Sequence, residues 1–82
     1  MPKVVISGSS LRAYTRGAGE FDVSANNFHR LVRELEERFP GLGRQVEEGM
    51  AIAVDGTIYQ DAYAAPIGPE SEVYLIPKIG GG

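Results

Sequence analysis

Residues 24–41 read SANNFHRLVRELEERFPG, and this stretch predicts the main helix of the chain. Its apolar residues recur at the i, i+3, i+4, i+7 and i+11 spacing that gathers side chains on one helix face. The polar residues just before this pattern can cap the first turn, and the Pro-Gly pair at 40–41 ends the helix. We therefore expect a helix over residues 27–39, with an apolar stripe made of Phe28, Leu31, Val32, Leu35 and Phe39.

Short segments of alternating apolar residues lie on both sides of this helix. Two precede it, at residues 3–7 and 20–24, and three follow it, at residues 50–54, 57–59 and 72–76. Alternation with a period of two is typical of strands that are buried on one face. The chain is therefore expected to run strand, strand, helix, strand, strand, strand.

The turns between these segments indicate how the strands pair. Asp55-Gly56 favours a tight hairpin, because both central residues of a type I′ turn need positive φ. The first two strands are joined by a wider loop that contains Gly17 and Gly19. A helix with a single apolar stripe must then cover one face of the sheet, with the first and last strands parallel at its centre. This α+β order, a mixed sheet of four to five strands crossed by one main helix, is similar to the β-grasp arrangement of ubiquitin.

Composition narrows the function classes. The 82 residues suffice for one domain, and the net charge of -3 argues against nucleic acid as the main partner. The absence of cysteine excludes disulfides, a thiolate nucleophile and Cys-based metal sites. No signal peptide or membrane span is recognisable, so we expect a cytoplasmic protein with no membrane partner.

The chain end is the one segment expected to take part in chemistry, since nothing else in the sequence resembles a catalytic constellation. Residues 1–77 are expected to form the domain, and residues 78–82 a flexible tail that ends in Gly80, Gly81 and Gly82. Glycine has no Cβ, so such a tail is thin enough to enter a narrow channel, with its carboxylate unshielded. The alternative is an ordinary frayed terminus.

Several segments together resemble the MoaD/ThiS sulfur carriers, that is, the small subunit of molybdopterin synthase and the thiamine-pathway carrier. The similarity spans most of the chain and lies in residues 11–17, 38–42, 52–56, 71–77 and 77–82. Two departures fall in turns: Asp55-Gly56 where Asn-Gly is more usual, and Ser71 where Asp is common. The tail keeps the family's order of Pro, any residue, an aliphatic, a small residue and Gly-Gly.

This resemblance implies a carrier that binds no cofactor itself and is not an enzyme. A ubiquitin-activating-type adenylating enzyme would use ATP to adenylate the Gly82 carboxylate, and a sulfur donor would convert it to a thiocarboxylate. A sulfur-accepting biosynthetic enzyme would then take the sulfur. A molybdopterin-type pathway is slightly favoured over a thiamine-type pathway or another.

The parity of the strands suggests where such partners dock. One set of alternate residues faces the helix, and the other set points away and is unusually apolar for a surface, which is typical of partner sites. The alternatives are a contact between copies of the chain, or cover by a loop at residues 62–69. The expected partner-binding residues are Val5, Ala51, Ala53, Tyr74 and Ile76, together with Lys78 and Ile79 of the tail.

Two other functions share this fold. A ubiquitin-like modifier would be joined to lysines of other proteins through Gly82, and with only Lys3 and Lys78 the chain offers few sites for self-linked chains. An inert β-grasp interaction module would leave its terminal mass unchanged with ATP and an adenylating enzyme.

Overall fold

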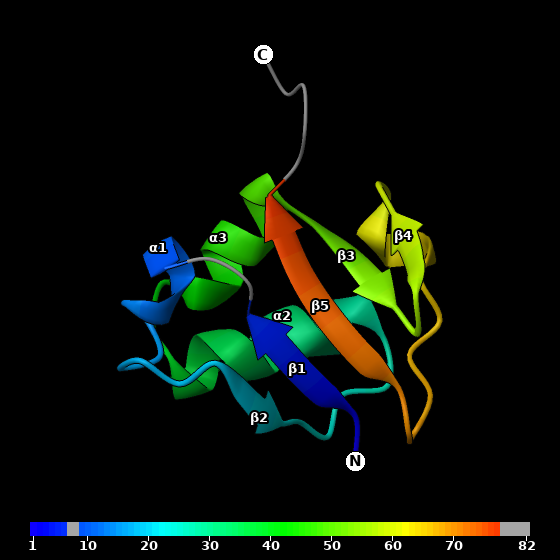
Figure 1. Cartoon of the computed structure of the whole chain (residues 1–82), viewed down its shortest axis with the longest axis horizontal. Coiled ribbons are helices and arrows are strands. Elements are labelled where there is room, and N and C mark those ends of the chain that lie inside the picture. Colours follow the sequence, from blue (N-terminus) through cyan, green and yellow to red (C-terminus); the bar gives the residue numbers. More distant parts are fainter. Residues whose placement is uncertain (7–8, 78–82) are drawn as a thin grey trace.

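The protein folds into a five-stranded sheet with helices on one face (Figure 1). The computed structural model describes residues 1–6 and 9–77. The strand order is β2-β1-β5-β3-β4; β1 and β5 are parallel, and the other neighbours are antiparallel. The elements are β1 (Lys3–Ile6), α1 (Ser9–Arg12), β2 (Glu20–Asp22), α2 (Phe28–Arg38), α3 (Leu42–Gly49), β3 (Met50–Val54), β4 (Thr57–Tyr59), the 3-10 helix η1 (Ala62–Ala64) and β5 (Glu72–Pro77). The predicted fold class and central parallel pair are confirmed.

The main helix α2 begins and ends within one residue of the prediction. Asn27 is its N-cap, and the side-chain oxygen accepts a hydrogen bond from the Arg30 N–H at 2.8 Å. The chain leaves through Phe39, and Gly41 then takes a left-handed φ of 96°. A side-chain cap at one end and a Pro-Gly exit at the other therefore fix the length of the helix.

The core lies between the sheet and the helices α2 and α3, which cover the same face (Figure 1). Alternate strand residues point into it, so that Val4, Ile52, Val73 and Leu75 are fully buried. From α2 the core takes Phe28, Leu31 and Leu35. The other face of the sheet carries no helix among the described residues, and we call it the outer face.

The hairpin between β3 and β4 has the predicted turn. Asp55 and Gly56 both have positive φ, at 51° and 89°. The Asp55 carboxylate also accepts hydrogen bonds from the Ser71 hydroxyl and the Glu72 N–H, each at 3.0 Å. The acidic residue at this turn therefore ties the hairpin to the start of β5.

Two helices differ from the sequence prediction. The expected order contains a single helix, but α1 covers Ser9–Arg12 at the start of the wide loop, and α3 covers Leu42–Gly49 after the Pro-Gly exit. Glu36 stabilises α3 from outside, since its carboxylate accepts from the N–H groups of Gly41 at 2.9 Å and Arg44 at 3.2 Å. The cap comes from another helix, so a local sequence pattern could not show it.

The close approach of α2 and α3 depends on Gly43. A Cβ built there lies 2.5 Å from the Val32 carbonyl oxygen and 2.8 Å from Glu36 Cβ, both too close for real atoms. We expect Gly43→Ala to lower the free energy of unfolding by about 1–3 kcal/mol, because the helices must move apart. Urea denaturation measures this, with Gly49→Ala in the same helix as the control, because its Cβ would meet nothing within 4 Å. Equal stability of the two variants would contradict this packing.

Candidate functional site

The central strand β5 leads to the proposed chemical end of the protein. It lies between β1 and β3, and its last residue, Pro77, pairs with Met50. The predicted tail residues lie outside the described part of the chain: they are Lys78, Ile79, Gly80, Gly81 and Gly82. What the structure describes is therefore the strand that precedes these residues and the face beside that strand.

A row of apolar residues crosses the outer face from strand to strand. Val5 on β1 is opposite Tyr74 on β5, Tyr74 is opposite Ala53 on β3, and Ala53 is opposite Ile58 on β4. Residues that are paired in this way across strands have their side chains on the same face. These four residues form what we call the apolar row, and one step closer to the end of β5 the pair Ala51 and Ile76 follows.

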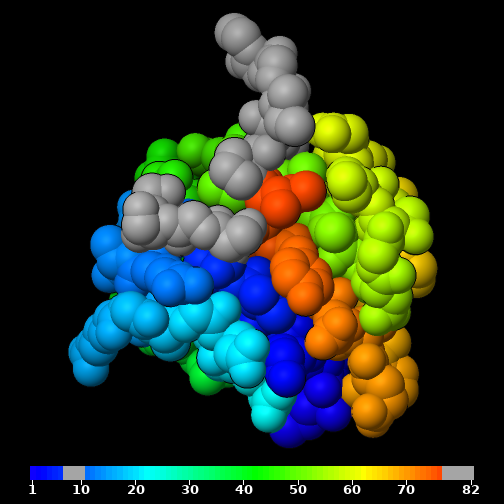
Figure 2. Space-filling view, in the orientation of Figure 1, coloured from blue at the N-terminus to red at the C-terminus, as the bar shows by residue number. Residues whose placement is uncertain are grey.

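The members of this face differ in how much surface they expose. Tyr74 is 38% exposed and Ile58 is 61% exposed, whereas Val5, Ala53 and Ile76 are half-buried. Figure 2 shows atoms of β1, β5 and the β3–β4 hairpin side by side on this surface, with no helix over them. The outer face therefore offers large apolar side chains to solvent.

Ala51 is a correction to the expected set. It has the predicted parity and does not belong to the buried cluster under the helices, yet it is only 1% exposed. Its short methyl group lies opposite the much larger Ile76 side chain. Ala51 is therefore a spacer within the sheet and offers almost no surface to a partner.

Ile58 is the residue of this face that the sequence prediction missed. A hairpin with a two-residue turn at Asp55 and Gly56 fixes the register, which places Ile58 opposite Ala53. The sequence could have shown this: once the turn is placed at Asp55 and Gly56, Ile58 pairs with Ala53 and therefore shares its face. Ile58 is more exposed than Tyr74 and extends the apolar row to the edge strand.

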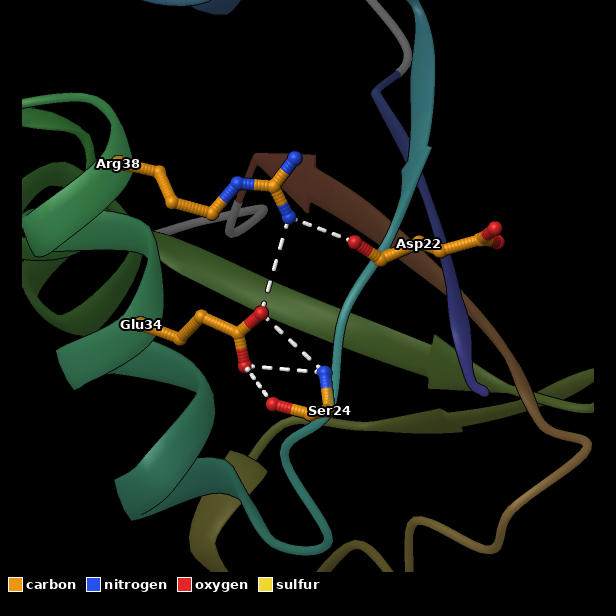
Figure 3. Close-up of polar contacts among 4 residues, drawn as sticks. All are labelled: Asp22, Ser24, Glu34 and Arg38. Atoms are coloured by element: carbon orange, nitrogen blue, oxygen red, sulfur yellow. Dashed lines mark hydrogen bonds and ion pairs between the residues drawn. The ribbon is translucent and has the colours of Figure 1, made fainter.

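On the other face of the sheet, a polar network fixes the segment between β2 and α2 (Figure 3). The Glu34 carboxylate accepts hydrogen bonds from the Ser24 N–H at 3.0 Å and the Ser24 hydroxyl at 3.1 Å. Arg38 donates to the Asp22 carbonyl oxygen at 2.6 Å and lies 3.6 Å from the Glu34 carboxylate. These bonds hold β2 against the helix, and they leave the Asp22 carboxylate pointing away from Arg38 (Figure 3).

Among the described residues, no three His, Asp or Glu side chains lie together in a group that could hold a metal ion. The Tyr63 hydroxyl donates to Glu47 at 2.7 Å, and this hydrogen bond raises the pKa of Tyr63 above its ordinary value. Tyr63 is 56% exposed and packs edge-on against Phe28 of α2, so it is a structural contact on the helix side of the sheet. Within the same described ranges, no helix has both the length and the hydropathy of a membrane span.

Solved structures from several organisms share this fold, and three of them are described here. CysO of Mycobacterium tuberculosis, described as an antigen, matches with a TM-score of 0.81 and 17% identity, covering 96% of this chain and 100% of that one. The BexX/CysO complex of Amycolatopsis orientalis matches with a TM-score of 0.80 and 17% identity, over 100% of both chains. The small archaeal modifier protein 1 (SAMP1) of Methanosarcina acetivorans matches with a TM-score of 0.76 and 18% identity, covering 99% of this chain and 95% of that one.

The fold and the open outer face define a ubiquitin-like β-grasp protein. A comparison with curated proteins gave no match. The model of the ThiS family matches residues 11–82, which include the tail. The chain therefore belongs to the ThiS family of ubiquitin-like sulfur carriers, whose members are carrier proteins and not catalysts themselves.

Proposed function

We propose that this chain carries sulfur as a thiocarboxylate on Gly82. The observation that carries the proposal is the extent of the family match, which runs to residue 82 and so includes the glycine tail. The central position of β5 supports it, because the tail follows a strand that is paired on both sides. The division into a domain of residues 1–77 and a tail of residues 78–82 belongs to the same proposal.

The chemistry needs two steps at the terminal carboxylate. An oxygen of the Gly82 carboxylate attacks the α-phosphorus of ATP, pyrophosphate leaves, and an acyl-adenylate forms. Sulfide-level sulfur from a donor then attacks the acyl carbon, and the bond to AMP breaks. The product is a thiocarboxylate, and the carbon undergoes no redox change. ATP is bound by the activating partner, so the carrier needs no cofactor of its own.

The outer face is proposed as the surface on which partner enzymes dock. Its exposed Tyr74 and Ile58 offer the kind of apolar contact that is typical of interfaces. The partners are an adenylating enzyme of the ubiquitin-activating type and a sulfur-accepting biosynthetic enzyme. The relative from Amycolatopsis orientalis was solved as a BexX/CysO complex, which supports a carrier that works bound to another protein. A molybdopterin-type acceptor is the first to test, followed by a thiamine-type acceptor.

The experiment is an intact-mass measurement of the purified chain after incubation with ATP, the adenylating enzyme and a sulfur source. We expect exchange of one oxygen for one sulfur, confined to the C-terminal peptide. A reaction without ATP is the control and should leave the mass unchanged. A mass that stays unchanged in the complete reaction would contradict the proposal and favour an inert module.

A second candidate function is protein modification through Gly82, which the likeness to SAMP1, a modifier protein by its description, favours. It shares the adenylation step but ends in an amide bond to a lysine of another protein. Peptide mapping of conjugates separates the two functions. A branched peptide that carries the C-terminal residues would indicate a modifier, and a free thiocarboxylate a carrier.

A further inference from the structure

A row of charged residues borders the apolar row on the outer face. Lys3 on β1 is opposite Asp22 on β2 and Glu72 on β5, and these three residues form what we call the charged row. Glu20, at the β2 end of the apolar row, lies 3.8 Å from the Lys3 ammonium. The charged row and the adjacent Glu20 therefore bring together three carboxylates, those of Asp22, Glu72 and Glu20, with one cation, Lys3.

Two of these carboxylates are free to meet a partner. No ion pair within residues 1–6 and 9–77 joins Asp22 or Glu72 to a cation. Both residues are exposed, and the Asp22 side chain points away from the helix side of the sheet (Figure 3). The backbone of each residue is hydrogen-bonded: Arg38 donates to the Asp22 carbonyl oxygen, and the Glu72 N–H donates to the Asp55 carboxylate. The Asp22 and Glu72 carboxylates themselves stay in solvent.

The charged row and the end of β5 lie on opposite sides of the apolar row. Glu72 is the first residue of β5 and Pro77 is the last. At about 3.3 Å per residue these two ends are roughly 17 Å apart. Along β5, the outer face is therefore acidic at the Glu72 end and apolar in the middle, and the described strand ends at Pro77.

We propose that the outer face binds a protein surface that is apolar at its centre and bordered by Arg or Lys on the side remote from the partner's catalytic site. This inference rests on the proposed function and names the chemistry of the partner surface. Complementary charge speeds encounter and suppresses wrong orientations, while the apolar contact supplies most of the affinity. With the charged row against a basic border, the Pro77 end of β5 faces the catalytic side of the partner.

A second copy of this chain fits the same face poorly. Both copies would bring their carboxylates to a shared interface, and within the described charged row Lys3, already next to Glu20, is the one cation to oppose them. Like charges across an interface disfavour association. Sedimentation of the wild-type chain tests this directly, and a stable dimer that buries Tyr74 would overturn the proposal.

The main test measures association with the adenylating enzyme by stopped-flow at low and high salt. The variant Asp22→Asn with Glu72→Gln removes two negative charges from the charged row. The control, Glu37→Gln with Glu48→Gln, removes two from the exposed helix side. We expect the first variant to associate about 3–10-fold more slowly at low salt, with little change in dissociation, and the difference to vanish near 0.5 M salt. The control should stay within about 2-fold of wild type.

Two results would overturn this inference. An unchanged association rate for the charged-row variant would remove its role, and an equal slowing in the control would show that only total charge matters. Thiocarboxylate formation by the wild-type chain is measured in parallel. If it occurs while the charged-row variant behaves as wild type, this inference fails and the proposed function stands; if it does not occur, the proposed function fails.

Discussion

A chain that lacks Gly82 is expected to form no thiocarboxylate with ATP, the adenylating enzyme and a sulfur source. Removal of one residue moves the terminal carboxylate back by about 3.3–3.6 Å of extended chain. Attack on a phosphorus or acyl centre requires the reacting atoms to lie within about 3–3.5 Å, so a shortfall of this size abolishes the step. Intact-mass measurement reads the result directly.

Two substitutions test whether the tail must also be free of bulky side chains. Gly81→Val is expected to fail as well, through bulk in the partner's channel and loss of backbone freedom. Gly80→Ala is the matched control and should keep its activity, because a small residue is accepted at that position in the resemblance. All three variants should unfold like wild type, since the buried core residues lie between Val4 and Leu75. Exchange of oxygen for sulfur in the chain that lacks Gly82 would contradict the proposed mechanism.

The sequence predicts those parts of the fold whose signals are local. The stripe from Phe28 to Leu35 and the Pro-Gly exit define α2, and the alternation in β5 places Val73 and Leu75 in the core. Asp55-Gly56 predicts its turn because only a few residue types accept positive φ at both positions. The sequence also predicts the first and last strands as a parallel pair at the centre of a sheet that the helix covers on one face, and the structure has this pair.

The features that the sequence could not predict depend on distant contacts. The α3 helix relies on the Glu36 carboxylate at its first turn and on the close passage of Gly43 along α2. The low exposure of Ala51 depends on its neighbours in space and not on its parity. The charged row exists only because the register places Asp22 and Glu72 beside Lys3. Such pairings require the assembled sheet.

Register also turns separate residues into one candidate surface. Val5, Ala53 and Tyr74 were expected to share a face, and the strand pairing places them in a single line that continues to Ile58. A continuous line of apolar side chains can be covered by one partner surface with little trapped water. Tyr74 lies inside this line, between β1 and β3, and a central aromatic residue is a typical hot spot.

We therefore expect Tyr74→Asp to weaken binding of the adenylating enzyme by about 30–1000-fold, which corresponds to roughly 2–4 kcal/mol for a central aromatic contact. The new carboxylate would also lose its water on binding without gaining a partner. Ile76→Asp should act in the same direction. Titration calorimetry measures both affinities, and circular dichroism checks that the fold survives.

The edge of the row has a matched pair of variants. Ile58 and Thr57 are both exposed on β4, but only Ile58 is paired into the apolar row, because Thr57 is opposite the buried Val54. Ile58→Asp is expected to weaken binding. Thr57→Asp adds the same charge to the same strand but should change affinity by less than about 2-fold, because the Thr57 side chain points to the opposite face of the sheet. If Tyr74→Asp, Ile76→Asp and Ile58→Asp all bind as well as Thr57→Asp while folded, the partner does not use the outer face, and the carrier must be held by its tail or by its helices.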